Sequence, residues 1–233
     1  MEHIEGLFGT VARLHDVLEP SLYVQFGLRS EEALAISGAN TIIIDPTVAP
    51  DAPLPEHVQM FRKSPSEFFR TDAPDVLQMK ADLYLLDGTK PFAELASDFR
   101  RILPYCDTTT VVAIDNIFPS GSSSETEPPA GSAGAWEFHC FLDEYHGGAF
   151  LQAIRSEPTG MLLVFAMVPE VDQDKMRSGL KTWRPGAQRF LAWDSAIENA
   201  RPDDIPTLTS MFRMLRLNRD GGTVPTRPSL GDT

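Results

Sequence analysis

The chain has 233 residues, of which 42% are hydrophobic and 23% are charged, and its formal net charge at pH 7 is -13. This length suits one α/β domain with an appendage, and the apolar residues suffice for a substantial core. The acidic excess lies in residues 1–169, and an acidic domain repels phosphate backbones. We therefore expect no nucleic-acid partner.

The cysteine content and the first residues indicate a cytoplasmic protein. Neither Cys106 nor Cys140 has a neighbour at the paired spacing of a metal site, and two lone cysteines fit a reducing compartment. The first ten residues lack a basic segment followed by an apolar core, and no window approaches the roughly 18 apolar residues of a membrane span. We expect neither a signal peptide nor a membrane partner.

The amino-terminal third alternates between helical patterns and short apolar runs. Apolar residues at helical spacing over 4–18 predict a helix that ends before Pro20. Three buried strands are predicted next, at 21–26, 40–44 and 57–63, with a helix at 30–37 behind the first. Ser64 and Glu67 have the spacing of a capping box, which predicts that a helix begins there.

Two apolar runs in the middle of the chain, 83–86 and 111–114, are each followed by an aspartate. Residues 92–103 carry apolar side chains at helical spacing, so the unit is predicted to be a strand, a crossover helix and a second, parallel strand. Parallel strands end on one edge of a sheet, where ligands bind in open α/β proteins. The polar residues that follow the two strands should share one crevice: Asp87, Lys90, Asp115 and Asn116.

The rest of the domain is predicted to add a helix and two strands. Aromatic residues at helical spacing over 136–145 predict the helix, and apolar runs at 150–154 and 161–168 predict an antiparallel pair. Residues 120–134 are rich in Gly, Ser, Pro and Glu, and they are expected to form a mobile loop over the site edge.

A C-terminal extension at 170–233 is expected to follow the domain at 1–169. We predict that the extension is partly helical and that its end is disordered. Its apolar residues are too many to leave in water, so they should pack on the domain or on a second subunit: Phe190, Trp193, Phe212 and Leu215. Packing on a second subunit would make the protein a homo-oligomer.

The order of these elements and the residues around the two aspartates resemble the class I S-adenosylmethionine-dependent methyltransferases. The matching motifs are Leu-Asp-Gly at 86–88 and Ile-Asp at 114–115 with Pro119 after it, and the resemblance covers roughly 21–168. It implies an α/β, Rossmann-like methyltransferase fold with a mostly parallel seven-stranded sheet, helices on both faces and an antiparallel final strand. It also implies an S-adenosylmethionine site at four positions: Gly27, Asp45, Ser64 and Asp87.

The first three of these positions each have a proposed role and a plainer alternative. Gly27 lets the backbone approach the ligand, but it is also consistent with an ordinary strand-to-helix turn. Asp45 would accept hydrogen bonds from both ribose hydroxyls because a carboxylate is acceptor-only, or it is simply part of an Asp-Pro turn. Ser64 or Ser66 would touch the adenine, or Ser64 only caps the helix that follows.

A metal site is the sharper hypothesis for the same edge. Asp87, Asp115 and Asn116 offer hard oxygen ligands, which suit Mg²⁺. Lys90 would then act as general base on a hydroxyl bound to that metal. This Asp-x-x-Lys and Asp-Asn arrangement is similar to that of the catechol O-methyltransferase branch. The alternative is that both aspartates only terminate strands and cap helices.

The sequence therefore predicts an enzyme that transfers a methyl group from S-adenosylmethionine to a hydroxyl of a small-molecule substrate, with Mg²⁺ assistance as an option. The alternative is a non-catalytic relative that keeps the fold as a binding or assembly module. Glu31 and Glu32 in the donor turn favour this alternative. An NAD-dependent oxidoreductase is disfavoured because no G-x-G-x-x-G follows the first strand.

Overall fold

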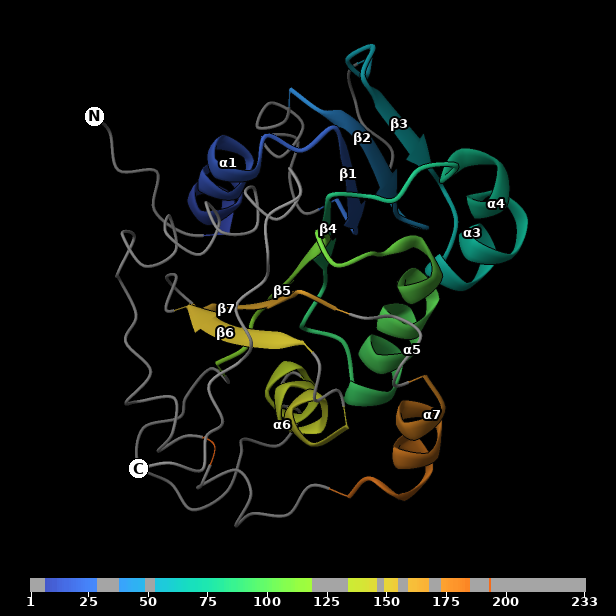
Figure 1. Cartoon of the computed structure of the whole chain (residues 1–233). Helices are drawn as coiled ribbons and strands as arrows, with labels where there is room; N and C mark the ends of the chain where they lie inside the picture. Colours follow the sequence, from blue (N-terminus) through green and yellow to red (C-terminus); the bar gives the residue numbers. More distant parts are fainter. Residues whose placement is uncertain are drawn as a thin grey trace.

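The computed structural model describes residues 7–28, 38–48, 53–118, 134–145, 149–154, 159–167, 173–184 and 193. A seven-stranded sheet forms its centre, and helices pack against it (Figure 1). The strands are β1 (Leu22–Phe26), β2 (Asn40–Ile44), β3 (Val58–Phe61), β4 (Leu83–Leu86), β5 (Val111–Asp115), β6 (Phe150–Ile154) and β7 (Met161–Phe165). The helices are α1 (Leu7–Leu18), α3 (Pro65–Thr71), α4 (Ala73–Val76), α5 (Phe92–Ile102), the short 3₁₀ helix η1 (Leu103–Tyr105), α6 (Ala135–Tyr145) and α7 (Gln173–Thr182).

The strand order across the sheet is β3-β2-β1-β4-β5-β7-β6. The first five of these strands pair in parallel, whereas β7 pairs antiparallel with both β5 and β6. The predicted α/β fold class, with a mostly parallel seven-stranded sheet and an antiparallel strand near its end, is confirmed. The third strand is shorter than the predicted 57–63.

Helices cover both faces of the sheet because successive residues of each strand point to opposite sides. One core lies under α1: Val11, Leu14, Tyr23, Leu83 and Leu85. The other core lies under α3, α5 and α6: Val24, Phe68, Tyr84, Phe99 and Phe138. The neighbours Leu83 and Tyr84 of β4 thus face different cores, and they are 1% and 0% exposed. Burial on both faces explains why this strand is a continuous apolar run in the sequence.

The β4–α5–β5 unit has the predicted crossover topology. β4 and β5 remain in parallel register up to Leu86 and Ile114. The residues that follow, Asp87 after β4 and Asp115 at the end of β5, therefore leave the sheet at the same edge.

The predicted start of α3 at Ser64 is confirmed. Ser64 is the N-cap, and its hydroxyl accepts a hydrogen bond from the backbone N–H of Glu67 at 3.2 Å. Pro65 occupies the first helical position, where its missing N–H costs nothing. Local sequence alone therefore determines where this helix begins.

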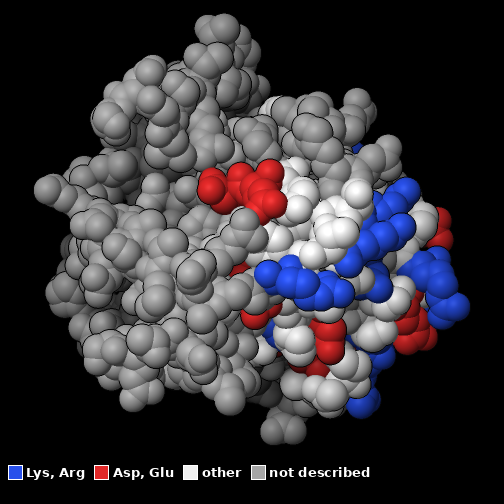
Figure 2. Space-filling view, turned by 90° about the horizontal axis from the view of Figure 1, so that it is seen from below, with Lys and Arg blue, Asp and Glu red and all other residues white. Residues whose placement is uncertain are grey.

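α7 and Trp193 are the described parts of the C-terminal extension. α7 packs against α5 and α6, and Trp193 is buried against the domain. Figure 2 shows basic side chains gathered on the described part of one face, with acidic side chains among them, although the whole chain is acidic. Exposed basic residues of the extension are Arg177, Lys181 and Arg184.

Several expectations fall on residues outside the described ranges: the helix at 30–37, most of the loop at 120–134, and Phe190, Phe212 and Leu215. Within the described ranges, no helix has the length and apolar character needed to cross a membrane.

Candidate functional site

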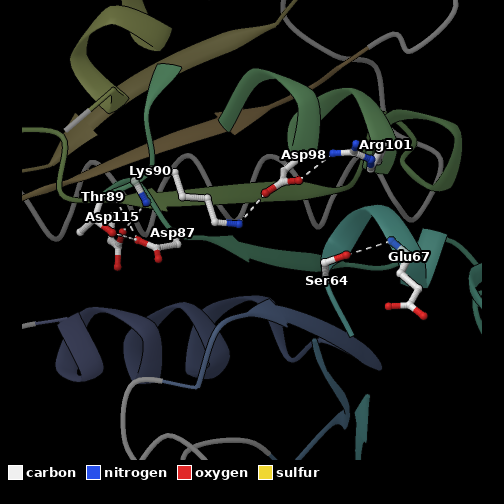
Figure 3. A network of polar contacts seen from close by, with 9 residues as sticks. Ser64, Glu67, Asp87, Thr89, Lys90, Asp98, Arg101 and Asp115 are labelled. Atoms are coloured by element: carbon white, nitrogen blue, oxygen red, sulfur yellow. Dashed lines mark hydrogen bonds and ion pairs between the residues drawn. The ribbon is translucent and has the colours of Figure 1, made fainter. Parts of the chain in front are cut away.

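The carboxyl edge of β4 and β5 brings the two predicted aspartates together. The backbone N–H of Gly88 donates to Asp115 Oδ1 at 2.7 Å, which ties the exit of β4 to the end of β5. Asp87 Oδ1 accepts from the backbone N–H and the hydroxyl of Thr89, at 2.9 and 2.5 Å. Asp87 and Asp115 lie side by side in Figure 3. Asp115 is 2% exposed.

Gly88 is required at this edge by close packing. A Cβ atom at this position would lie 1.7 Å from the carbonyl oxygen of Asp115 and 3.1 Å from the Cβ of Ala135. α6 begins beside it, and the N–H of Gly134 donates to the carbonyl oxygen of Lys90 at 3.0 Å. The Leu-Asp-Gly motif therefore contains a glycine that lets two strand ends and a helix start meet.

Lys90 forms an ion pair that the sequence analysis did not anticipate. Its Nζ lies 2.6 Å from Asp98 Oδ2, and Arg101 Nη1 lies 2.9 Å from Asp98 Oδ1. Asp98 lies on α5 and is 5% exposed. Figure 3 shows the Lys90 side chain running toward Asp98 and away from the two aspartates at the strand ends. The predicted general-base role of Lys90 therefore stays a prediction.

A sequence signal for Asp98 did exist. α5 buries an apolar stripe that includes Leu95 and Ile102, and Asp98 lies between them on the same helix face. A lone acid on the buried face of a helix needs a cationic partner, because an unpaired buried charge is costly. The nearby lysine and arginine are the available partners.

The turn after β1 and the end of β2 form the second part of the candidate site. Gly27 has φ 82°, in the left-handed region that favours glycine. Its N–H donates to the carbonyl oxygen of Ile44 at 2.9 Å, and the N–H of Leu28 donates to Asp45 Oδ2 at 2.8 Å. Gly27 and Asp45 are thus brought together at one edge, and the ribose site there stays a prediction.

Asp45 also caps its own turn. Its Oδ1 accepts hydrogen bonds from the backbone and hydroxyl of Thr47, at 2.7 and 2.8 Å, and from the N–H of Val48 at 3.0 Å. Burial raises the pKa of Asp45, but these hydrogen bonds and the one from Leu28 outweigh burial and leave the pKa below its usual value. Asp45 is therefore an ionised acceptor at neutral pH, and Oδ2 carries fewer of these internal bonds than Oδ1.

Asp45 should contribute stability that is lost in acid. Its pKa is lower in the folded protein than the usual 3.8, so the contribution is complete above that value and disappears as the pH falls through the folded-state pKa. We expect Asp45→Asn to lower the free energy of unfolding at pH 7, and the difference from wild type to shrink at pH values below about 4. Urea denaturation across this pH range measures the free energy of unfolding of both proteins. If the difference between them did not change with pH, the pKa of Asp45 would not be lowered by folding.

Ser64 and Asn116 are the remaining predicted site residues. The hydroxyl of Ser64 is engaged in capping α3, and a contact with adenine stays a prediction. Asn116 follows β5 with φ 52°, a left-handed conformation that asparagine tolerates better than most residues. In the described part of the chain, no cluster of three or more His, Cys, Asp and Glu side chains suits a metal ion. A Mg²⁺ site built with the amide of Asn116 stays a prediction.

A cavity of about 530 Å³ lies on the opposite edge of the sheet. It is lined at the amino ends of β1, β2 and β3 by residues such as Leu22, Asn40, His57 and Gln59. None of the predicted site residues lines it. We place the candidate site at the carboxyl edge because ligands of open α/β sheets bind outside the carboxyl ends of the strands.

No protein-family model and no curated protein matches this chain. Solved structures match its fold. The O-methyltransferase TomG from Streptomyces achromogenes, in complex with S-adenosylmethionine, has a TM-score of 0.53 at 14% identity over 68% of this chain and 78% of that chain. This chain has a methyltransferase fold. The methyltransferase PaMTH1 from Podospora anserina, bound to S-adenosylhomocysteine, has a TM-score of 0.52 at 12% identity over 68% and 77%.

The methyltransferase fold explains why the candidate residues gather on one edge. β1 lies between β2 and β4, and β5 lies beside β4, so the exits of four parallel strands form a continuous row. Gly27, Asp45, Asp87 and Asp115 stand at or directly after these four exits. The exits of β1 and β2 form one half of this row, and those of β4 and β5 form the other half.

Proposed function

We propose that this protein is a cytoplasmic S-adenosylmethionine-dependent methyltransferase that acts on a hydroxyl of a small molecule. One observation carries the proposal: the methyltransferase fold presents a glycine turn and an ionised aspartate at the exits of β1 and β2. Structures of the same fold have been solved with S-adenosylmethionine or its demethylated product bound.

The donor is proposed to lie against Gly27 and Asp45. Within the described ranges, the nearest atom to a Cβ added at Gly27 would be Asp45 Oδ2 at 3.9 Å, so no described side chain covers the backbone of this left-handed turn. Asp45 Oδ2 accepts from Leu28, and a carboxylate oxygen has a second lone pair for a ribose hydroxyl. Asp45 would then join the donor to the strand exits by a charge-assisted hydrogen bond.

The acceptor is proposed to lie at the exits of β4 and β5. Catalysis would consist mainly of holding the hydroxyl in line with the donor methyl group. Asp87, Asp115 and Asn116 offer oxygens of the kind that Mg²⁺ takes, and a bound ion would lower the pKa of the acceptor hydroxyl. Lys90 is proposed as general base, and it must leave Asp98 and lose its proton before it can accept one.

Calorimetric titration with S-adenosylmethionine and S-adenosylhomocysteine tests the donor site. Wild-type protein should bind both, and Asp45→Ala should weaken binding tenfold or more, because a hydrogen bond to a charged group contributes about 1.5 to 3 kcal/mol. Thr47→Val is the matched control. It removes one hydroxyl donor from Asp45 Oδ1 and leaves Oδ2 in place, so its affinity should stay within about threefold of wild type, a difference of well under 1 kcal/mol.

A non-catalytic binding or assembly module is the second candidate. The observation that favours it is the number of internal hydrogen bonds that Asp45 accepts, four in all from Leu28, Thr47 and Val48. These hydrogen bonds would be reason enough for an aspartate at this position even if the protein bound no ribose. Absence of heat with either ligand on wild-type protein would favour this second function over the methyltransferase.

A further inference from the structure

Trp193 joins the C-terminal extension to α6. Its indole Nε1–H donates to His139 Nδ1 at 3.0 Å, and its ring centroid lies 5.9 Å from that of Trp136. Trp193 is 6% exposed. Burial lowers the pKa of His139 to about 4, so the imidazole is neutral at pH 7 and its Nδ1 is able to accept. The contact is therefore a packed aromatic ring with a directed hydrogen bond.

The same indole ring also reaches the segment that leaves β5. The ring centroids of Trp193 and Phe118 lie 6.1 Å apart. From the other direction, the N–H of Phe118 donates to the carbonyl oxygen of Thr159 at 2.8 Å. A Cβ atom on Gly160 would lie 2.1 Å from the Phe118 ring, so this ring is packed against backbone just before β7. Phe118 is thus held between the β6–β7 connection and the extension.

Two residues before Phe118, Asn116 adopts a left-handed backbone conformation with φ 52°. Such a conformation costs a non-glycine residue free energy and persists only where the surrounding structure imposes it. Asn116 directly follows Asp115, whose Oδ1 accepts from Gly88. The segment 116–118 is therefore fixed at its start by the strand and at its end by the packing of Phe118.

We propose that Trp193 is a positioning residue: through Phe118, the C-terminal extension holds segment 116–118 and with it the amide of Asn116 at the carboxyl edge. Through Trp193, the extension then contributes to the acceptor side of the site, which lies at β4 and β5, whereas the donor side lies at β1 and β2. The role of Trp193 in positioning an acceptor rests on the proposed methyltransferase function. Its role in fixing segment 116–118 does not depend on that function.

Amide hydrogen exchange in the full chain, followed by NMR, tests this inference. In Trp193→Ala, exchange of the Phe118 amide should rise at least tenfold, while the amides of β1 and β2 change little beyond any global loss of stability. Trp193→Phe keeps an aromatic ring but loses the donor to His139, so it should show a smaller rise. If Trp193→Ala does not fold, the same measurement on Trp193→Phe tests the inference.

Trp183→Ala is the matched control. Trp183 belongs to the same extension and is 4% exposed, but its ring packs against Phe92, Phe141 and Tyr145 and not against Phe118. It should therefore leave exchange at 116–118 unchanged relative to the rest of the protein. Unchanged exchange of the Phe118 amide in both Trp193 variants, or an equal rise in Trp183→Ala, would overturn the inference.

Calorimetry with S-adenosylhomocysteine separates this inference from the proposed function. We expect Trp193→Phe to bind this ligand within about twofold of wild type, because the donor side lies at other strands. If the Trp193 variants lost affinity for S-adenosylhomocysteine as amide exchange at 116–118 rose, the assignment of the extension to the acceptor side would be overturned. Absence of binding by wild-type protein would overturn the methyltransferase function and leave the exchange result standing.

Discussion

Gly88→Ala is expected to unfold the protein or to lower its free energy of unfolding by more than about 4 kcal/mol. The added Cβ would lie 1.7 Å from the carbonyl oxygen of Asp115. This oxygen belongs to the backbone of β5, which is held in the sheet between β4 and β7, so it cannot move aside without breaking strand pairing. The substitution thus disturbs the core and the candidate site together. Urea denaturation followed by circular dichroism measures the loss.

Gly38→Ala is the matched control for this effect. Among the described residues, a Cβ atom at Gly38 would meet nothing within 4 Å. We expect its free energy of unfolding to stay within about 1 kcal/mol of wild type, because alanine only restricts the unfolded chain where the native conformation accepts it. Equal stability of Gly88→Ala and Gly38→Ala would show that the exits of β4 and β5 are not in close contact.

Asp98→Ala is expected to lower the free energy of unfolding by about 2 to 4 kcal/mol, since it breaks a buried ion-pair network and leaves two cations without their shared carboxylate. Lys90 and Arg101 side chains are 23% and 30% exposed, so water recovers part of the loss. Salt should change the difference from wild type only slightly, because buried pairs are screened much less than exposed ones. Urea denaturation at low and high salt measures the loss in the free energy of unfolding and its dependence on salt.

Asp72→Ala is the corresponding control at the surface. Asp72 pairs with Lys63 at 2.6 Å, the same distance as Lys90 and Asp98, but the Asp72 side chain is 23% exposed, against 7% for Asp98. An ion pair whose acid is closer to water contributes less to stability, so the loss should be smaller and should decrease further with salt. A larger loss for Asp72→Ala than for Asp98→Ala would contradict the central role of the network on α5.

Local patterns in the sequence determined most of the fold. Apolar runs of strand length, each followed by a polar residue, located β2, β4 and β5, because a strand buried on both faces has no polar position until it leaves the sheet. Ser64 and Glu67 located the start of α3, because capping satisfies backbone groups only three residues away. The parallel crossover from β4 to β5 followed from the handedness of such units, and it predicted that Asp87 and Asp115 share an edge.

Tertiary structure decided which of the available partners the polar side chains of the site take. Lys90 is near Asp87 in sequence, yet it pairs with Asp98, because the packing of α5 on the sheet buries that acid within reach of Nζ. Trp193 and His139 are 54 residues apart, and no local pattern relates them. Periodicity encodes which face of an element is buried, whereas hydrogen-bond partners depend on differences of less than about 1 Å in how those elements pack.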